Sequence, residues 1–306
     1  MRPTPLIESG RIAAGGKDNV CKAIITMTQL STLAYSHAAP HASGLATCIG
    51  VYSKAINLLT ESGGLLTLHD ATHGLSAAGW LLADADFHTI GRKIQPQSIV
   101  RLSAEGLESD GFLLRRAGRR LNLRLNASAR PLHAERLRSV LCHLPKETGL
   151  YGPLHRLAAA PLSAELKRIV ALFSQSLSGQ RVDWSSYIGM GPGLTPSSDD
   201  VLVGMLAAAY GYTPSAHALR RCPLFAHAQP LERLTTHVSC AYLHHAGKGY
   251  FSTPLRRAVF ALRQNGRDMA AVARLLSHGH TSGADTLLGV WLGATAIEQL
   301  PSGFSL

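Results

Sequence analysis

The sequence is poor in charged residues and contains no long hydrophobic run, and each shortage excludes a class of protein. Charged residues make up 16% of the 306 residues and hydrophobic residues 46%, a balance that excludes a largely disordered chain. Gly, Ser or charged residues interrupt the longest apolar stretches before they reach the roughly 18 to 20 residues that a membrane-spanning helix needs. We therefore expect a chain that is folded almost throughout and has no membrane partner.

Aromatic residues are also scarce, at 6%, although the chain is strongly basic. It has 30 Lys and Arg against 19 Asp and Glu, which gives a formal charge of +11 and favours anionic partners. The densest basic group consists of Arg115, Arg116, Arg119, Arg120 and Arg124. No aromatic residue is interleaved with these arginines, so the sequence lacks the stacking surface of a nucleic-acid-binding module. We expect a small anionic substrate and no nucleic acid.

Paired cysteine motifs are missing as well. The chain has five cysteines, an odd number, without any Cys-x-x-Cys spacing, which indicates neither a disulfide framework nor a zinc knuckle. The first 40 residues do not combine the charged region, apolar block and cleavage site of a secretory signal. These features favour a cytoplasmic protein.

Two periodicities divide the chain. Residues 45–130 contain short runs of strand-forming residues separated by Gly and Asp, with strict alternation over 121–125, and they predict a β-rich barrel or sandwich. After residue 131 the apolar residues recur at helical spacing, and helices are predicted over 166–177, 200–210, 231–246, 254–264, 268–277 and 286–300. The fold class expected is therefore α+β, with an N-terminal extension (1–44), a β-rich domain (45–130) and a mainly α-helical domain (131–306).

The most informative segment is rich in glycine and occurs twice in related forms. The first copy reads Gly189-Met-Gly-Pro-Gly-Leu-Thr-Pro-Ser-Ser-Asp-Asp200, and the second reads Gly279-His-Thr-Ser-Gly-Ala-Asp285. A further glycine, Gly204 or Gly289, follows the last Asp of each copy by four residues. Both copies precede segments that are too apolar for surface helices, so they mark the N-termini of two central helices.

The spacing between Asp and Gly indicates that the two helices touch. Residues four apart share one helix face, so Gly204 lies one turn below Asp200, and the second copy repeats this arrangement. Stabilisation of the helix dipole by acidic residues, at roughly 0.3 to 1 kcal/mol each, is the simpler explanation of the carboxylates. It does not explain the glycines, which cost about 1 kcal/mol each relative to Ala inside a helix. Thr195 is expected to cap the first helix, with Pro196 at its first position.

The space between two such helix ends would offer a ligand backbone N–H groups, hydroxyls and carboxylates. Backbone N–H groups and helix dipoles suit a phosphate or carboxylate, whereas carboxylates suit amide N–H donors or a divalent cation. A substrate that carries both an anionic group and an amide nitrogen matches all of them.

The two copies, together with the intervening Thr235-Thr-His-Val-Ser239, resemble the AllH family, the oxamate carbamoyltransferase subunit. Ser53-Lys-Ala-Ile-Asn57 is similar to the opening strand motif of that family, so the resemblance extends over residues 51–300. Ser198 stands where the family commonly has Gly, a departure that puts the substrate in question more than the fold.

The resemblance implies a subunit that works beside an FdrA-type protein, which is itself similar to acyl-CoA synthetases, and beside a further carbamoyltransferase subunit. The implied reaction converts oxalurate and phosphate to oxamate and carbamoyl phosphate in anaerobic allantoin (purine) catabolism. The alternative is a noncatalytic subunit that binds a ligand or stabilises the FdrA-type complex.

The resemblance also implies roles for particular residues. Asp199, Asp200 and Asp285 would take the amide side of the substrate, or a Mg²⁺ ion if one is used. The substrate contacts would come from Gly191, Gly193, Thr195, Pro196, Ser197, Thr236, Ser239, Thr281, Ser282 and Gly283.

Histidines near the motifs are candidates for acid–base chemistry because the ordinary pKa of His lies near 6.5. His280 is the one expected to be catalytic, whereas His278 is better explained as a histidine facing a helix C-terminus, and His237 is the third nearby. His69 and His73 have the spacing of metal ligands, but Gly74 and the surrounding strands favour a turn.

Overall fold

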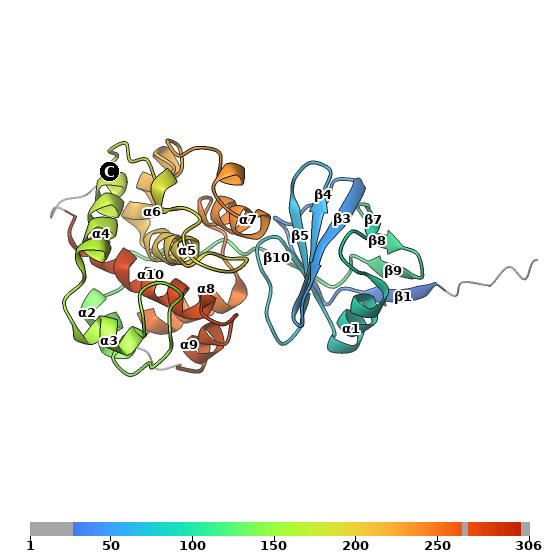
Figure 1. Ribbon diagram of the computed structural model, residues 1–306, viewed down its shortest axis with the longest axis horizontal. Helices are drawn as coiled ribbons and strands as arrows, with labels where there is room; N and C mark the ends of the chain where they lie inside the picture. The colour runs from blue at the N-terminus through green and yellow to red at the C-terminus, as the bar shows by residue number, and fades with distance from the viewer. Residues whose placement is uncertain (1–26, 265–268, 301–306) are drawn as a thin grey trace, which may run out of the picture.

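Strands fill the first half of the chain and helices the second in the computed structural model, which describes residues 27–264 and 269–300 (Figure 1). The α+β class expected from the sequence is confirmed. Residues 1–26 of the expected N-terminal extension lie outside the described part, and residues 28–36 of it contribute two strands to the sheet. The division into domains near residue 130 remains our proposal.

The sheet has ten strands in the order β1-β9-β8-β7-β3-β4-β5-β6-β2-β10 and curls into a half-barrel (Figure 1). The strands are β1 (Thr28–Ser31), β2 (Ala34–Ser36), β3 (Gly44–Val51), β4 (Ala55–Thr60), β5 (Leu65–Asp70), β6 (Gly79–Leu82), β7 (Ile99–Leu102), β8 (Gly106–Ser109), β9 (Phe112–Arg115) and β10 (Arg119–Leu121). Helix α1 (Asp84–Lys93) buries Phe87 and Ile90 in the same core as Leu58 and Trp80. Burial of such side chains is the main source of stability for this half.

The predicted strand over residues 121–125 is wrong beyond Leu121. The backbone there turns to the helical half, where the N–H of Leu125 donates to the carbonyl of Gly249 (2.9 Å) and the N–H of Phe251 donates to the carbonyl of Leu123 (3.1 Å). Apolar and polar residues do alternate here, but the backbone hydrogen-bond partners of these residues lie in the second half of the chain.

The helical half surrounds two buried helices, α5 (Ser197–Tyr210) and α10 (Ser282–Glu298). The others are α2 (Ala134–Leu141), α3 (Leu154–Ala159), α4 (Ala164–Leu177), α6 (Thr213–Arg221), α7 (His237–Ala246), α8 (Thr253–Arg263) and α9 (Met269–Leu276), with short 3-10 turns at Ser185–Tyr187 and Leu231–Arg233. Within the described residues, no helix is long and apolar enough to cross a membrane.

The largest differences from the predicted helix boundaries lie at three helix starts. The helix predicted over 231–246 begins at His237, because the Thr236 hydroxyl caps it by accepting from the N–H of Ser239 (3.1 Å). Helix α10 begins about one turn earlier than predicted, at Ser282. Pro196, not Thr195, occupies the N-cap position of α5, because its carbonyl accepts from the N–H groups of Asp199 and Asp200.

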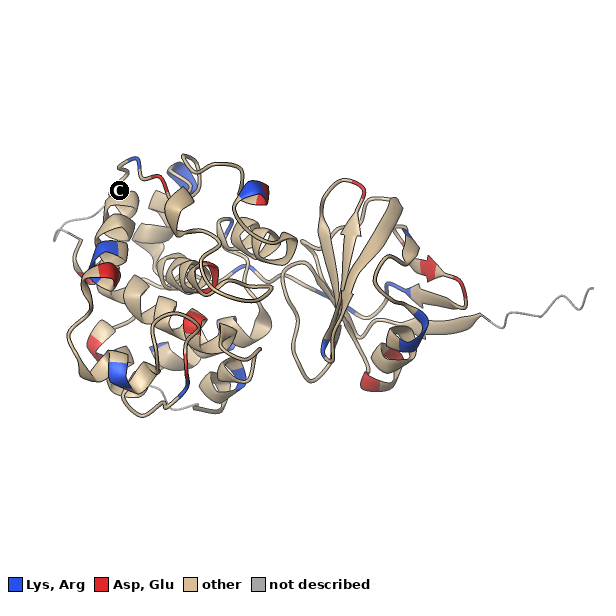
Figure 2. Cartoon of the chain, in the orientation of Figure 1, with Lys and Arg blue, Asp and Glu red and all other residues tan. Residues whose placement is uncertain are grey.

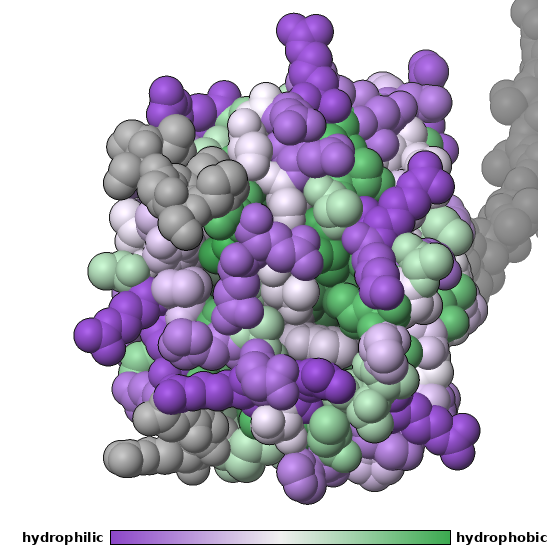
Figure 3. All heavy atoms as spheres, turned by 90° about the vertical axis from the view of Figure 1, so that its left-hand side faces the viewer, coloured by the Kyte–Doolittle hydropathy of each residue, from purple (hydrophilic) through white to green (hydrophobic). Residues whose placement is uncertain are grey.

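Basic side chains are scattered over both halves, whereas acidic ones mark the first turns of α5 and α10 (Figure 2). The outer end of the helical half, away from the sheet, presents hydrophilic side chains around patches of hydrophobic ones (Figure 3). The two halves meet at its opposite end, where Thr253 at the start of α8 exchanges two hydrogen bonds with Leu75, of 2.9 and 3.0 Å. A turn of the β half is thereby fixed beside the helix starts.

Candidate functional site

The two glycine-rich motifs meet because α5 and α10 cross at their glycines. A Cβ atom added to Gly204 would lie 2.0 Å from the carbonyl oxygen of Thr286, and one added to Gly289 would lie 2.0 Å from that of Val201. No side chain fits in so little space, so the backbones are in direct contact. The predicted close approach of the two helices is confirmed.

Asp199 is enclosed by hydrogen-bond donors of the protein itself. One carboxylate oxygen accepts from the N–H of Gly189 (2.7 Å), and the other accepts from the hydroxyls of Thr235 (2.5 Å) and Ser239 (2.6 Å). The residue is almost fully buried. Asp199 therefore fastens the glycine-rich loop to the start of α7, and it has little capacity left for a substrate.

The glycine-rich loop projects from these anchors. Gly189, Gly191 and Gly193 all have φ between +82° and +110°, a conformation that favours glycine over other residues. The Ser198 hydroxyl holds the loop by accepting from the N–H of Met190 (2.8 Å) and donating to its carbonyl (3.0 Å). The hydroxyl at the position that departs from the family pattern thus acts on loop shape, and residues 191–194 are exposed to solvent.

Asp285 holds a second loop against the start of α10. Both of its carboxylate oxygens accept from the N–H of Gly149, at 3.0 and 3.2 Å. Burial raises the pKa of the Asp285 carboxyl, while hydrogen bonds from Gly149, Thr281 and Ser197 act to lower it. A larger residue at position 149 would displace the Ser197 hydroxyl, since its Cβ would lie 1.9 Å from that oxygen.

Asp200 differs from the other two because one of its oxygens, Oδ2, is buried without a hydrogen-bond partner among the described residues. Burial raises the pKa of Asp200 well above its ordinary value, and the neighbouring Asp285 and Asp199 add to this. The hydroxyls of Ser282 and Thr195 act in the opposite direction without cancelling the effect. The raised pKa favours the protonated form of Asp200, which can donate a hydrogen bond as well as accept one.

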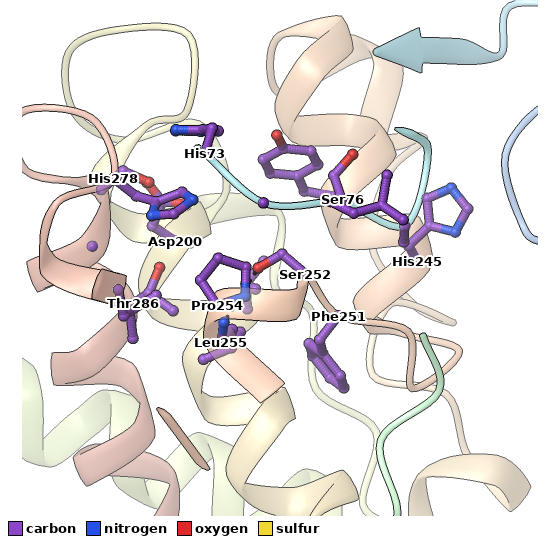
Figure 4. A pocket seen from close by; sticks show the side chains of 18 of the residues that line it. His73, Ser76, Asp200, His245, Phe251, Ser252, Pro254, Leu255, His278 and Thr286 are labelled. Atoms are coloured by element: carbon purple, nitrogen blue, oxygen red, sulfur yellow. Dashed lines mark hydrogen bonds between the residues drawn. The ribbon is translucent and has the colours of Figure 1, made fainter. Parts of the chain in front are cut away.

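The unpartnered oxygen belongs to a residue that lines a cavity between the two halves of the molecule (Figure 4). The cavity has a volume of about 80 Å³, room for several water molecules or a small ligand. Its polar lining includes Ser282, Thr286 and Tyr242 from the helical half and His73 and Ser76 from the β half. None of the described residues that line it is Lys or Arg. A ligand here is recognised by hydrogen bonds and not by a positive charge.

Three histidines occupy the side of the cavity next to the β half. The ring centroids of His73 and His278 are 4.0 Å apart, and those of His73 and His69 are 5.8 Å apart. Asp70 builds the turn that presents His73, because its Oδ1 accepts from the N–H of Thr72 (2.6 Å). His69 is fixed by a 2.8 Å hydrogen bond between its Nε2 and the Ser76 hydroxyl.

These histidines are uncharged at neutral pH. Burial lowers the pKa of His69 to about 3 and that of His73 to about 4, and the proximity of the rings to one another lowers both further. Burial also lowers the pKa of His278. Tyr242, whose pKa is raised to about 12 by burial and by Asp200, remains protonated. The cavity thus combines a carboxyl group whose raised pKa favours the protonated form with imidazoles whose lowered pKa favours the neutral form, and such groups can exchange a proton with a ligand.

The residues predicted from the sequence fall into three groups. Asp200, Ser282 and Gly283 line the cavity. A second set forms or anchors the loops around it: Gly191, Gly193, Thr195, Pro196, Ser197, Asp199, Thr236, Ser239, Thr281 and Asp285. His280 is exposed and is not among the residues that line the cavity.

The sequence reasoning missed the contribution of His73, His278 and Tyr242. His278 lies at a helix C-terminus, as expected, since its Nδ1 is 3.0 Å from the carbonyl oxygen of Arg274. Its ring also borders the cavity. The spacing of His69 and His73 is that of metal ligands, whereas Gly74 and the surrounding strands predicted the turn that is present. Neither the histidine spacing nor Gly74 revealed that this turn packs against the other half of the chain.

The three aspartates do not fit a Mg²⁺ site. Asp199 is saturated by protein donors, both oxygens of Asp285 accept from Gly149, and only Oδ2 of Asp200 is free. Mg²⁺ needs ionised carboxylates with oxygens free to coordinate it, and the free oxygen here belongs to Asp200, whose raised pKa opposes ionisation. We therefore derive no step through magnesium.

Paired helix starts, a glycine-rich loop and a buried carboxyl group beside a cavity are the features of a candidate small-molecule site, built largely from backbone groups and hydroxyls. Residues 187–294, which include both motifs, match the model of a protein family described as oxamate carbamoyltransferase subunit AllH. The resemblance recognised in the twin motifs is confirmed for that segment. No solved structure matches the chain.

Proposed function

We propose that the chain is a catalytic subunit of a carbamoyltransferase complex that converts oxalurate and phosphate to oxamate and carbamoyl phosphate. The family match over both motifs supports the transferase class. The observation that carries the catalytic role is Asp200, a buried carboxyl group with a raised pKa and a free oxygen, at a cavity that lies between two helix starts.

The two ends of oxalurate differ in charge, and the site offers a matching pair of environments. The carboxylate or phosphate would bind N–H groups in the exposed part of the loop, at Gly191, Gly193 and Leu194, near the positive end of α5. The neutral carbamoyl end would enter the cavity, where Asp200, Ser282 and Tyr242 provide hydrogen-bonding groups and no lining Lys or Arg competes.

In the proposed reaction a phosphate oxygen attacks the carbamoyl carbon and forms a new C–O bond. The C–N bond to the oxamate nitrogen then breaks, and Asp200 donates the proton that this nitrogen needs to leave as the amide of oxamate. A neutral imidazole, His278 or His73, takes the proton that the attacking phosphate gives up. N–H groups at the helix starts would stabilise the tetrahedral oxyanion formed on the way.

A partner subunit is expected to cover the exposed loops. Leu150, Met190 and Leu194 are large hydrophobic residues that are 42%, 41% and 43% exposed, and all three lie on the loops that Gly149, Gly191 and Gly193 shape around the helix starts. Apolar side chains clustered around a site are typical of surfaces that bind another protein. We propose that the FdrA-type subunit or the further carbamoyltransferase subunit binds here.

The four cysteines in the described part of the chain are free, which agrees with a reducing compartment and with our proposal of a cytoplasmic enzyme. The pathway proposed is anaerobic allantoin catabolism, in which oxalurate arises.

Reconstitution tests the proposal. The purified chain, its partners and the full set are each incubated with oxalurate and phosphate, and carbamoyl phosphate is measured. We expect product only from the full set, and none when this chain is omitted. Product from the partners alone would show that the chain is noncatalytic.

A further inference from the structure

A second cluster of ligand side chains lies around helix α7, outside the cavity of Asp200. Glu232 comes from the 3-10 turn Leu231–Arg233, while Cys240 and His244 are one turn apart on α7. Cys240 Sγ lies 3.5 Å from Glu232 Oε1 and 3.6 Å from His244 Nδ1. One ligand atom from each residue lies within 4.8 Å of both others.

The two distances from Cys240 Sγ are close to those between ligands of a tetrahedral site. Zinc bonds of about 2.0 to 2.3 Å place two ligand atoms of a tetrahedron about 3.5 Å apart. A zinc ion could therefore be bound without a change in the backbone. The donor set of one sulfur, one imidazole nitrogen and one carboxylate oxygen suits Zn²⁺ and not Mg²⁺ or Ca²⁺, which prefer oxygen alone.

A cavity beside the cluster is the second, independent observation. It has a volume of about 340 Å³ and lies between α7 and two loops of the β half, at residues 38–42 and 62–65. Glu232, Cys240 and His244 all line it, and so do His41 and His237. The side chains of Glu232 and His244 are 56% and 50% exposed, so an ion can enter.

We propose that Glu232, Cys240 and His244 bind a zinc ion whose fourth position faces this cavity. Cys240 loses its proton to solvent when the thiolate binds the metal. The fourth ligand is water, or His237 one turn before Cys240. Because α7 begins with the residues that hold Asp199, the ion fixes the 3-10 turn to the helix that anchors the glycine-rich loop.

The test uses the full chain with Zn²⁺ or Co²⁺ as the only probe. After addition of a small excess of zinc and dialysis to remove the unbound ion, we expect about one zinc ion per chain by mass spectrometry. Cobalt should give the near-ultraviolet absorption band of a Co²⁺–thiolate bond. The matched variants are Cys240→Ser and Cys142→Ser, the latter removing another free cysteine, which is exposed.

Cys142→Ser should behave as wild type, whereas Cys240→Ser should lose the thiolate band and bind zinc at least about tenfold more weakly. Glu232→Gln should weaken binding while keeping the band. The proposal is overturned if the wild-type chain gives no thiolate band with cobalt, or if Cys240→Ser retains wild-type zinc affinity. The cobalt spectrum of the wild-type chain tests the proposed site even if a variant fails to fold.

Discussion

At the scale of single residues, three aspartates that look alike in the sequence have different roles. The carboxylate oxygens of Asp199 and Asp285 accept hydrogen bonds that hold loops in place. The donors are Gly189, Thr235 and Ser239 for Asp199 and Gly149 for Asp285. Asp200 alone keeps a buried oxygen free. Residue type and spacing could predict that carboxyls gather here. They could not predict which one stays available, because the donors come from loops far apart in the chain.

The raised pKa of Asp200 gives the protein a particular dependence of stability on pH. The unfolded carboxyl loses its proton near its ordinary pKa of about 3.9, whereas the folded one keeps it to higher pH. Between these two pKa values the folded state binds the extra proton, so this group makes stability fall as pH rises, by up to about 1.4 kcal/mol per pH unit. Asp200→Asn should remove that slope in chemical denaturation between pH 5 and pH 9. A surface variant, Asp110→Asn, should leave it in place; an unaltered slope in Asp200→Asn would show that the carboxyl ionises normally.

The two neighbouring histidines His278 and His280 offer a matched comparison. His278 lines the cavity as a neutral base, whereas His280 is exposed outside it. We expect His278→Gln to lower turnover of the complex by about 10²-fold, the usual effect of losing a general base, and His280→Gln to change it less than about twofold. Initial rates at saturating oxalurate and phosphate measure both. The reverse order would restore the assignment made from the sequence.

At the scale of helices and strands, the contact between α5 and α10 is what places the motifs together. Gly204 and Gly289 could be interpreted correctly from the sequence, because helix periodicity fixes which residues share a face. The turn at His73 could not be placed in this way. Its contact with α8 depends on hydrogen bonds between Leu75 and Thr253, and pairing between distant segments leaves no periodic signal.

Gly204→Ala tests the helix contact directly. The added Cβ would lie 2.0 Å from the Thr286 carbonyl oxygen, so the helices must separate, and we expect the free energy of unfolding to fall by at least about 2 kcal/mol. Gly91→Ala in α1 is the control, since its Cβ would meet no described atom within 4 Å. It should stabilise the protein by about 0.5 to 1 kcal/mol through helix propensity. Equal effects of the two variants in urea denaturation would refute the close contact.

At the scale of the whole molecule, the cavity belongs to neither half alone. The motifs predicted the helical side of the site, while the β half contributes His73 and Ser76. The exposed Leu150, Met190 and Leu194 form the surface that we propose a partner subunit covers. The molecule is thus interpreted as one component of a larger enzyme, in which the buried acid Asp200 performs the chemistry.

The most direct test of this interpretation is the rate at which the reconstituted complex forms carbamoyl phosphate when it carries Asp200→Asn. Asn keeps the shape of the side chain but cannot donate the proton to the leaving nitrogen, so we predict a rate about 10² to 10⁴ times lower, with the complex still assembled and its melting temperature nearly unchanged. A rate within about twofold of the wild-type complex would contradict the catalytic role of this chain.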